Sequence, residues 1–253
     1  MRKDNTVDSN LCFCGSEKNK SQCHYDVNED SVLANMIKSY NKLSNSINDS
    51  IKKQSVKLPC KKGCSQCCND YFYIDQFEYY VILYRLLRRG EDVKKLYDKA
   101  NHIGQKIKKV YPDEYNKVTS KIKTSIISDN DFNINIPCIF LNDKNYCNIY
   151  SARPYVCRIH SVLLNECKCT FKKNFDKKYP NYTLPTFEKT YDDVDIYDFF
   201  PNGKIKTIEY PMWYWFSHFL KYYLDGKDIK FYYFQHKSEA EFKNLIKKLH
   251  RIT

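Results

Sequence analysis

Cysteine clustering constrains this chain more than any other feature of its sequence. The 253 residues include twelve cysteines, and four of them fall within nine positions, at Cys60, Cys64, Cys67 and Cys68. Thiolates held this close together repel one another unless a cation neutralises their charge. A bound metal is therefore the simplest explanation of the cluster, and the fold has to bring its ligands together.

The N-terminal sequence bears on the compartment in which these thiols exist. Residues 1–5 are polar, and the apolar run of a signal peptide is lacking. No uncharged apolar stretch approaches the roughly 18 residues that a transmembrane helix requires. We therefore expect a cytoplasmic protein, where thiols stay reduced and clustered cysteines favour metal binding over disulfide bonds.

Composition argues against several common functions. The six glycines lie at least fourteen positions apart, so neither a GxGxxG dinucleotide loop nor a GxxxxGK[ST] phosphate loop can form. The patterns G-x-S-x-G, HExxH and DxDxDG do not occur, which gives hydrolase and calcium-sensor functions no support. The formal net charge of +12 is spread along the chain without a basic tail or stripe, and we identify no specific nucleic-acid motif.

Hydrophobic periodicity predicts a mainly α fold with a short β-hairpin. We expect helices over 31–53, 76–89, 93–107, 112–126, 211–224 and 238–250, and a short one that starts at Arg153-Pro154. The segments Cys138–Leu141 and Tyr146–Tyr150 flank a polar turn and predict the hairpin. If Leu141 pairs with Tyr146, Cys138 and Cys147 point to the same face of the hairpin.

The N-terminal segment carries a compact set of metal-ligand side chains: Cys12, Cys14, Cys23 and His24. Three thiols and an imidazole suit tetrahedral zinc, and so short a segment cannot fold on an apolar core alone. These residues, with Gly15-Ser16 and Lys18, resemble the SEC-C zinc motif, although Glu17 stands where that motif usually has Gly. The resemblance implies a zinc-binding module that contacts the ribosome or the export machinery.

A second set of ligands comes from three separate segments. The four clustered thiols are joined by Cys138 and Cys147 on the predicted hairpin and by Cys157 on the short helix after it. We expect these seven thiols to meet at one site. Zinc and iron both accept thiolate ligands, so the choice stays open, with the excess beyond four thiols favouring an iron–sulfur cluster.

The spacing of these cysteines resembles the YkgJ-type cysteine-cluster family, described as a zinc- or iron-chelating domain. The resemblance rests on Cys60-x3-Cys64-x2-Cys67-Cys68, on Cys138-Ile-Phe-Leu141, and on Cys147 to Arg158 with its Arg153-Pro154 pair. That family includes the flagellin lysine N-methylase, which implies an alternative function as an S-adenosylmethionine-dependent protein lysine N-methyltransferase acting on a protein such as flagellin. Arg153 and Arg158 would then help bind the methyl donor, because no glycine-rich loop is available.

Other patterns near the main cluster stay open. Cys60-x3-Cys64-x2-Cys67 also has the spacing of a radical S-adenosylmethionine loop, but the predicted flanks are helical and repeated βα units are missing. His160, Cys167 and Cys169 are further candidate ligands. Tyr71-Phe72-Tyr73 is expected to shield the site from water, and the aromatic segment 210–220 is expected to lie in the core.

These features predict three regions along the chain. Residues 1–29 form a SEC-C-like zinc module, 30–57 a connecting helix, and 58–253 the cysteine-cluster domain. A metal-binding protein is the first functional hypothesis, the methyltransferase the second, and an adaptor acting through residues 11–24 the third.

Overall fold

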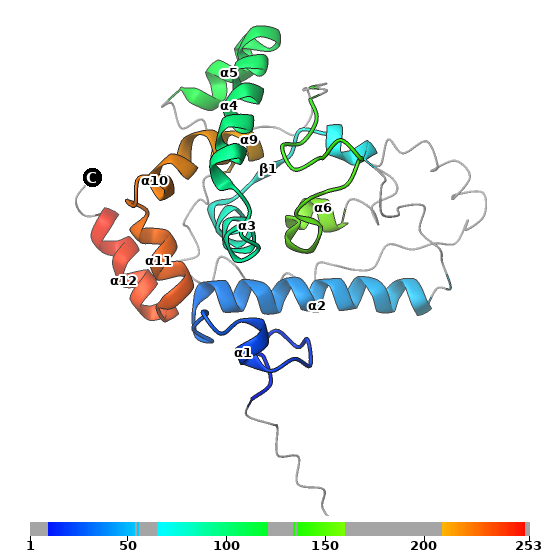
Figure 1. Cartoon of the computed structure of the whole chain (residues 1–253), viewed down its shortest axis with the longest axis vertical. Coiled ribbons are helices and arrows are strands. Elements are labelled where there is room, and N and C mark those ends of the chain that lie inside the picture. Colours follow the sequence, from blue (N-terminus) through cyan, green and yellow to red (C-terminus); the bar gives the residue numbers. More distant parts are fainter. Residues whose placement is uncertain are drawn as a thin grey trace, which may run out of the picture. The chain divides into compact units, whose positions relative to one another are not determined.

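A computed structural model shows a mainly helical chain with one small antiparallel sheet (Figure 1). The structure describes residues 10–53, 55, 65–120, 134, 136–159 and 209–250. The predicted fold class is confirmed in these residues. Within them, none of the helices is both long enough and apolar enough to span a membrane.

The chain divides into two compact units. Among the described residues, the first unit contains 10–46 and 229–250, and the second contains the rest. The expected region boundaries after residues 29 and 57 stay predictions.

In its described residues, the first unit contains four helices: α1 (Lys20–Cys23), the start of α2 (Val32–Lys53), α11 (Ile229–His236) and α12 (Glu239–His250). The Ser31 hydroxyl accepts a hydrogen bond from the Ala34 amide and so caps α2. Ser31 also forms an antiparallel bridge with Ser238, which ties the start of α2 to the start of α12. Helical periodicity does not predict α11, because the aromatic run Phe231–Phe234 places apolar side chains all around that helix.

The second unit starts at the cysteine segment. The 3₁₀ turn η1 (Gln66–Asn69) leads to strand β1 (Tyr73–Ile74), followed by α3 (Gln76–Arg88), α4 (Val93–Val110) and α5 (Pro112–Thr119). Helix α3 begins with a capping box, since the Asp75 carboxylate accepts from the Glu78 amide and the Glu78 carboxylate accepts from the Asp75 amide. A second 3₁₀ turn, η2 (Tyr150–Ala152), precedes the short helix α6 (Tyr155–Ile159).

The C-terminal aromatic segment supplies the core of the second unit. It runs through β2 (Tyr210–Pro211), α9 (Met212–Tyr214), the π-helical η3 (Trp215–Phe219) and α10 (Leu220–Leu224), so the single helix predicted there contains a π turn. Trp215 is buried, stacks on Tyr79 and donates to the Ile74 carbonyl at 2.7 Å. The expected core position of this segment is thereby confirmed.

The strand pairing lies elsewhere than the predicted hairpin. β1 pairs with β2 in antiparallel register, Tyr73 with Pro211 and Ile74 with Tyr210. Around 138–148, the structure has a turn with a single bridge between Leu141 and Cys147, one position away from the expected Leu141–Tyr146 pair. The cause is local: the Leu141 amide donates back to the Cys138 carbonyl, so that segment is a turn rather than a strand.

Candidate metal centres

The N-terminal site is built on a tight backbone loop. The Cys12 amide donates to the Lys18 carbonyl at 2.8 Å, and the Lys20 amide donates to the Asn10 carbonyl at 2.8 Å. Between these bonds, Gly15 has a φ of +73°, in the left-handed region that favours glycine. The loop thus turns sharply after Cys14, which leaves the first two thiols on one side.

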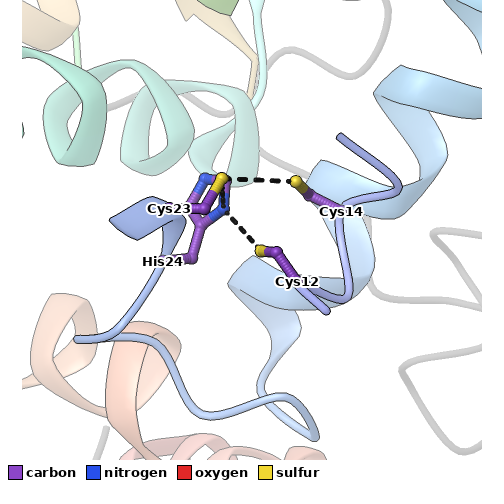
Figure 2. Close-up of side chains that lie close together, drawn as sticks. All are labelled: Cys12, Cys14, Cys23 and His24. Atoms are coloured by element: carbon purple, nitrogen blue, oxygen red, sulfur yellow. Dashed lines mark hydrogen bonds between the residues drawn. The ribbon is translucent and has the colours of Figure 1, made fainter. Parts of the chain in front are cut away.

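Helix α1 supplies the other two ligands. Cys23 is its last residue and His24 its C-cap. Figure 2 shows the four side chains pointing toward one another. The Cys12 and Cys23 sulfurs each lie 3.2 Å from His24 Nδ1, and the Cys14 and Cys23 sulfurs are 3.5 Å apart.

The geometry of this donor set fits a tetrahedral metal ion. All four ligand atoms lie within 4.8 Å of one another. Zn–S bonds of about 2.3 Å at tetrahedral angles place two ligand atoms roughly 3.7 Å apart, close to the separations found here. The four predicted zinc ligands are therefore brought together by the fold.

The electrostatics of the two loop cysteines differ. Burial raises the pKa of the Cys12 thiol to about 12. Burial also acts on Cys14, but hydrogen bonds from Ser16, Cys12 and Cys23 outweigh it and lower the pKa of that thiol below its ordinary value. Cys12 therefore keeps its proton more firmly than Cys14 does, and a bound divalent cation would replace the thiol protons.

Helix α2 supports this site with residues that the cysteine spacing does not reveal. The Asn41 side-chain amide donates to the Cys14 carbonyl at 2.5 Å. One turn earlier, the Lys38 ammonium lies 5.5 Å from the centre of the Phe13 ring, and that ring lies 5.3 Å from the His24 ring. Lys38 and Asn41 occupy one face of α2, which is the only signal for them in the sequence.

The main cysteine site lies in the second unit, where five of the seven predicted thiols are described: Cys67, Cys68, Cys138, Cys147 and Cys157. Cys60 and Cys64 lie outside the described residues, as do His160, Cys167 and Cys169. The Cys138 amide donates to the Cys68 carbonyl at 2.7 Å, which joins the first two cysteine segments directly.

These five thiols interact electrostatically. Loss of water contact raises the pKa of Cys138 to about 12, and it raises the pKa of Cys157 well above its ordinary value. The pKa of Cys68 is raised by its hydrogen bond with Cys67, by burial, and by the neighbouring Cys138 and Cys147. Within the described parts of the chain, however, three or more ligand atoms come within 4.8 Å of one another only at the N-terminal site.

Three cations surround the main thiols. Burial raises the pKa of Cys147, while the charges of Arg153 and Arg89 lower it. Lys99 acts in the same direction on the pKa of Cys138, against the larger effect of burial. Sequence reasoning identified Arg153 but not Arg89 or Lys99, because α3 and α4 precede the loop that carries these two cysteines by tens of residues.

Arg153 and Arg158, the predicted cofactor-binding residues, hold the segment before Cys157. Arg158 is buried and donates to the carbonyls of Arg153 and Ser151, at 2.7 Å each. The Arg153 guanidinium lies 3.8 Å from the centre of the Tyr150 ring and donates to the Tyr150 carbonyl. Binding of a methyl donor by either arginine stays a prediction.

Glu78 links the capping of two helices near this site. Besides closing the capping box of α3, its carboxylate accepts a hydrogen bond of 2.6 Å from the Tyr155 amide. Because Pro154 has no N–H, Tyr155 offers the first donor of α6, the helix that carries Cys157. The buried Glu78 carboxylate thereby fixes the start of the helix that carries Cys157.

Comparison with known proteins agrees with this arrangement of thiols. The CxxCxxCC family model, described as a "Putative zinc- or iron-chelating domain", matches residues 59–182. That segment is similar to this family. The YkgJ-type resemblance is thereby confirmed, whereas the SEC-C resemblance of residues 12–24 stays a prediction. No curated protein and no solved structure matches the chain.

The match to the CxxCxxCC family model indicates a coarse function for residues 59–182. The matched residues include all seven predicted thiols of the main site and also Cys167 and Cys169. Zinc or iron chelation is the property that the family description states. Thiolate ligands suit both metals, and the donor set present here fits either one.

Proposed function

We propose that this chain is a metal-binding protein with two separate thiolate sites. The first holds zinc between Cys12, Cys14, Cys23 and His24. The second holds zinc or an iron–sulfur cluster through Cys60, Cys64, Cys67, Cys68, Cys138, Cys147 and Cys157. The observation that carries the proposal is the convergence of three sulfurs and one imidazole nitrogen within 4.8 Å.

The first site is proposed to be structural. Three thiolates and a histidine complete a tetrahedral shell and leave no open position for a substrate. The surrounding loop is short and carries little apolar surface of its own, so a bound ion would contribute directly to its stability.

The main site is supported by its family and by its charge. Five half-buried thiols interact with one another there. Four of them would be costly to ionise without a cation, because their pKa values are raised: Cys68, Cys138, Cys147 and Cys157. The seven ligands exceed the four that one tetrahedral ion accepts. This excess favours a cluster or a second ion, and in either form Arg89, Lys99 and Arg153 would offset the remaining negative charge.

Replacement of single ligands tests both sites. His24→Ala and Cys23→Ser should each remove one zinc per chain, whereas Cys138→Ser and Cys147→Ser should lower the metal content of the main site only. His102→Ala, an exposed histidine on α4, is the matched control and should leave metal content unchanged. Equal metal content in all five proteins would contradict the proposal.

Methyl transfer and an adaptor role rest on resemblance alone and are not part of the proposed function. A direct assay separates them from it: S-adenosylmethionine should raise the melting temperature of a methyltransferase and leave a passive chelator unchanged. Removal of residues 1–28 should abolish partner binding by an adaptor while the main site retains its metal.

A further inference from the structure

The turn between Cys138 and Cys147 is held from both sides by helices of the second unit. Phe140 and Ile149 are buried and anchor its two ends. Just inside those anchors, the Lys99 ammonium donates to the Leu141 carbonyl at 2.9 Å, and the Arg89 guanidinium donates to the Asn148 carbonyl at 2.7 Å. The two acceptors lie on either side of the bridge that joins Leu141 to Cys147.

The two hydrogen bonds lie close to the two thiols of the turn. The acceptor of Lys99 is Leu141, three residues after Cys138, and the acceptor of Arg89 is Asn148, the residue after Cys147. Within the described residues, neither cation pairs with a carboxylate. Their positive charge is therefore available to the sulfurs, and a thiolate–metal site is anionic and needs such donors.

Ordinary surface cations do not show this arrangement. Both side chains are exposed, and an exposed lysine or arginine usually extends into water, where a single contact contributes little. Here two cations from different helices, α4 and the C-cap of α3, converge on the segment 138–148 and donate to its backbone carbonyls.

We propose that Arg89 and Lys99 are positioning residues of the main metal site, which fix the Cys138–Cys147 turn against α3 and α4 and offset the thiolate charge of its metal-bound form. This inference rests on the proposed function of that site. It adds two residues, outside all the cysteine segments, on which metal affinity depends.

The test is the Zn²⁺ affinity of the main site, measured by competition with a chromophoric chelator. A Cys14→Ser/Cys23→Ser background of the full chain silences the N-terminal site. Arg89→Gln and Lys99→Gln should each weaken Zn²⁺ binding roughly tenfold, the low end of the usual effect of such outer residues because both are exposed. Arg89→Lys should recover most of the loss, and the loss should shrink at high salt because the charges are screened.

Matched controls lie next to each residue. Arg88→Gln removes an arginine that contacts the Tyr84 hydroxyl, and Lys95→Gln removes an exposed lysine one turn before Lys99. Both should bind Zn²⁺ like the background protein. Co²⁺ absorption spectra should change with Arg89→Gln and Lys99→Gln, which a loss of general stability alone would not produce.

Two results would overturn the inference, and they are distinguishable. If the background protein binds Zn²⁺ at the main site and both glutamine variants bind it equally well, Arg89 and Lys99 have no positioning role. If the background protein itself binds no Zn²⁺, the proposed function of the main site fails, and this inference fails with it.

Discussion

Gly15 shows how a single residue sets the geometry of the N-terminal site. Its φ is +73°, and a Cβ placed there would meet no atom within 4 Å. Alanine would therefore be strained by backbone conformation alone, at a cost of about 1–2 kcal/mol. Gly15→Ala should weaken Zn²⁺ binding at this site by about tenfold, since ~1.4 kcal/mol is a factor of ten.

Gly226→Ala is the matched control for this prediction. Gly226 has a φ of +67° and open space around it, but it lies in the second unit. It should lower the melting temperature while leaving N-terminal Zn²⁺ affinity unchanged in the same chelator competition. An unaltered affinity in Gly15→Ala would show that the turn does not control the ligands.

Asp75 provides a pH-dependent contribution to stability. Burial raises the pKa of this carboxyl from 3.8 to about 6, and the charge of Glu209 adds to the effect. The folded state thus favours the protonated carboxyl more than the unfolded chain does. The stability that this difference contributes is present below pH 3.8 and is lost as pH rises through 6. The change corresponds to at most ~3 kcal/mol.

Asp75→Asn should therefore become more stable relative to the parent as pH rises from 4 to 7, because asparagine still caps α3 and cannot ionise. The free energy of unfolding, measured by urea denaturation of chelator-treated protein at both pH values, checks this. Asp92→Asn makes the same change at the exposed N-cap of α4 and is the comparison. A gain in stability that is no larger for Asp75→Asn than for Asp92→Asn would contradict the prediction.

The close packing of α4 against the aromatic segment is set by Gly104. A Cβ at this position would lie 2.8 Å from a ring atom of Trp213, which is buried, stacks on Tyr115 and donates to the Tyr71 hydroxyl. Alanine favours a helix by about 1 kcal/mol over glycine, but overpacking costs ~1–3 kcal/mol. Gly104→Ala should thus lower the free energy of unfolding.

A double-mutant cycle checks that the loss comes from this contact. In a Trp213→Phe background, the smaller ring leaves room, and Gly104→Ala should cost less than in the parent. Additive effects of the two substitutions, measured by urea unfolding, would indicate that the tryptophan already adapts to the added methyl group.

At the level of elements, sequence periodicity predicted α2, α3, α4 and α12 because each buries one face and has a recognisable start or stop. It did not locate the sheet, since β1 and β2 are two-residue strands separated by more than a hundred positions. The register of the 138–148 turn also could not be predicted. The Asn142 side chain accepts from the Lys144 and Tyr146 amides and sets a local turn that alternation does not encode.

In the candidate sites too, some residues could be predicted from the sequence and others could not. The spacing of cysteine and histidine predicted the four side chains that converge at the N-terminal site, and it predicted the five described thiols as candidate ligands of the main site. It could not identify Asn41, Glu78, Arg89 or Lys99, because these side chains act through backbone carbonyls or amides of segments distant in the chain. Their residue types are common on exposed helices, so only the tertiary structure assigns them a place.

On the scale of the whole molecule, the two sites lie in different compact units. Metal that binds a folded unit but not its unfolded chain stabilises that unit, and tighter binding stabilises it more. We therefore expect a chelator to lower the melting temperatures of both units, measured by calorimetry. Cys23→Ser should lower only the melting temperature of the first unit. A uniform shift of the whole profile in Cys23→Ser would show that the units unfold as one.

The central claim, that this chain holds metal at two thiolate sites, is tested most directly by its metal content. The measurement is anaerobic purification of the full chain, followed by a visible absorption spectrum and iron, zinc and sulfide analysis on one sample. We predict one zinc per chain together with either further zinc or stoichiometric iron and sulfide. A protein that carries no stoichiometric metal would contradict the assignment of both cysteine sites.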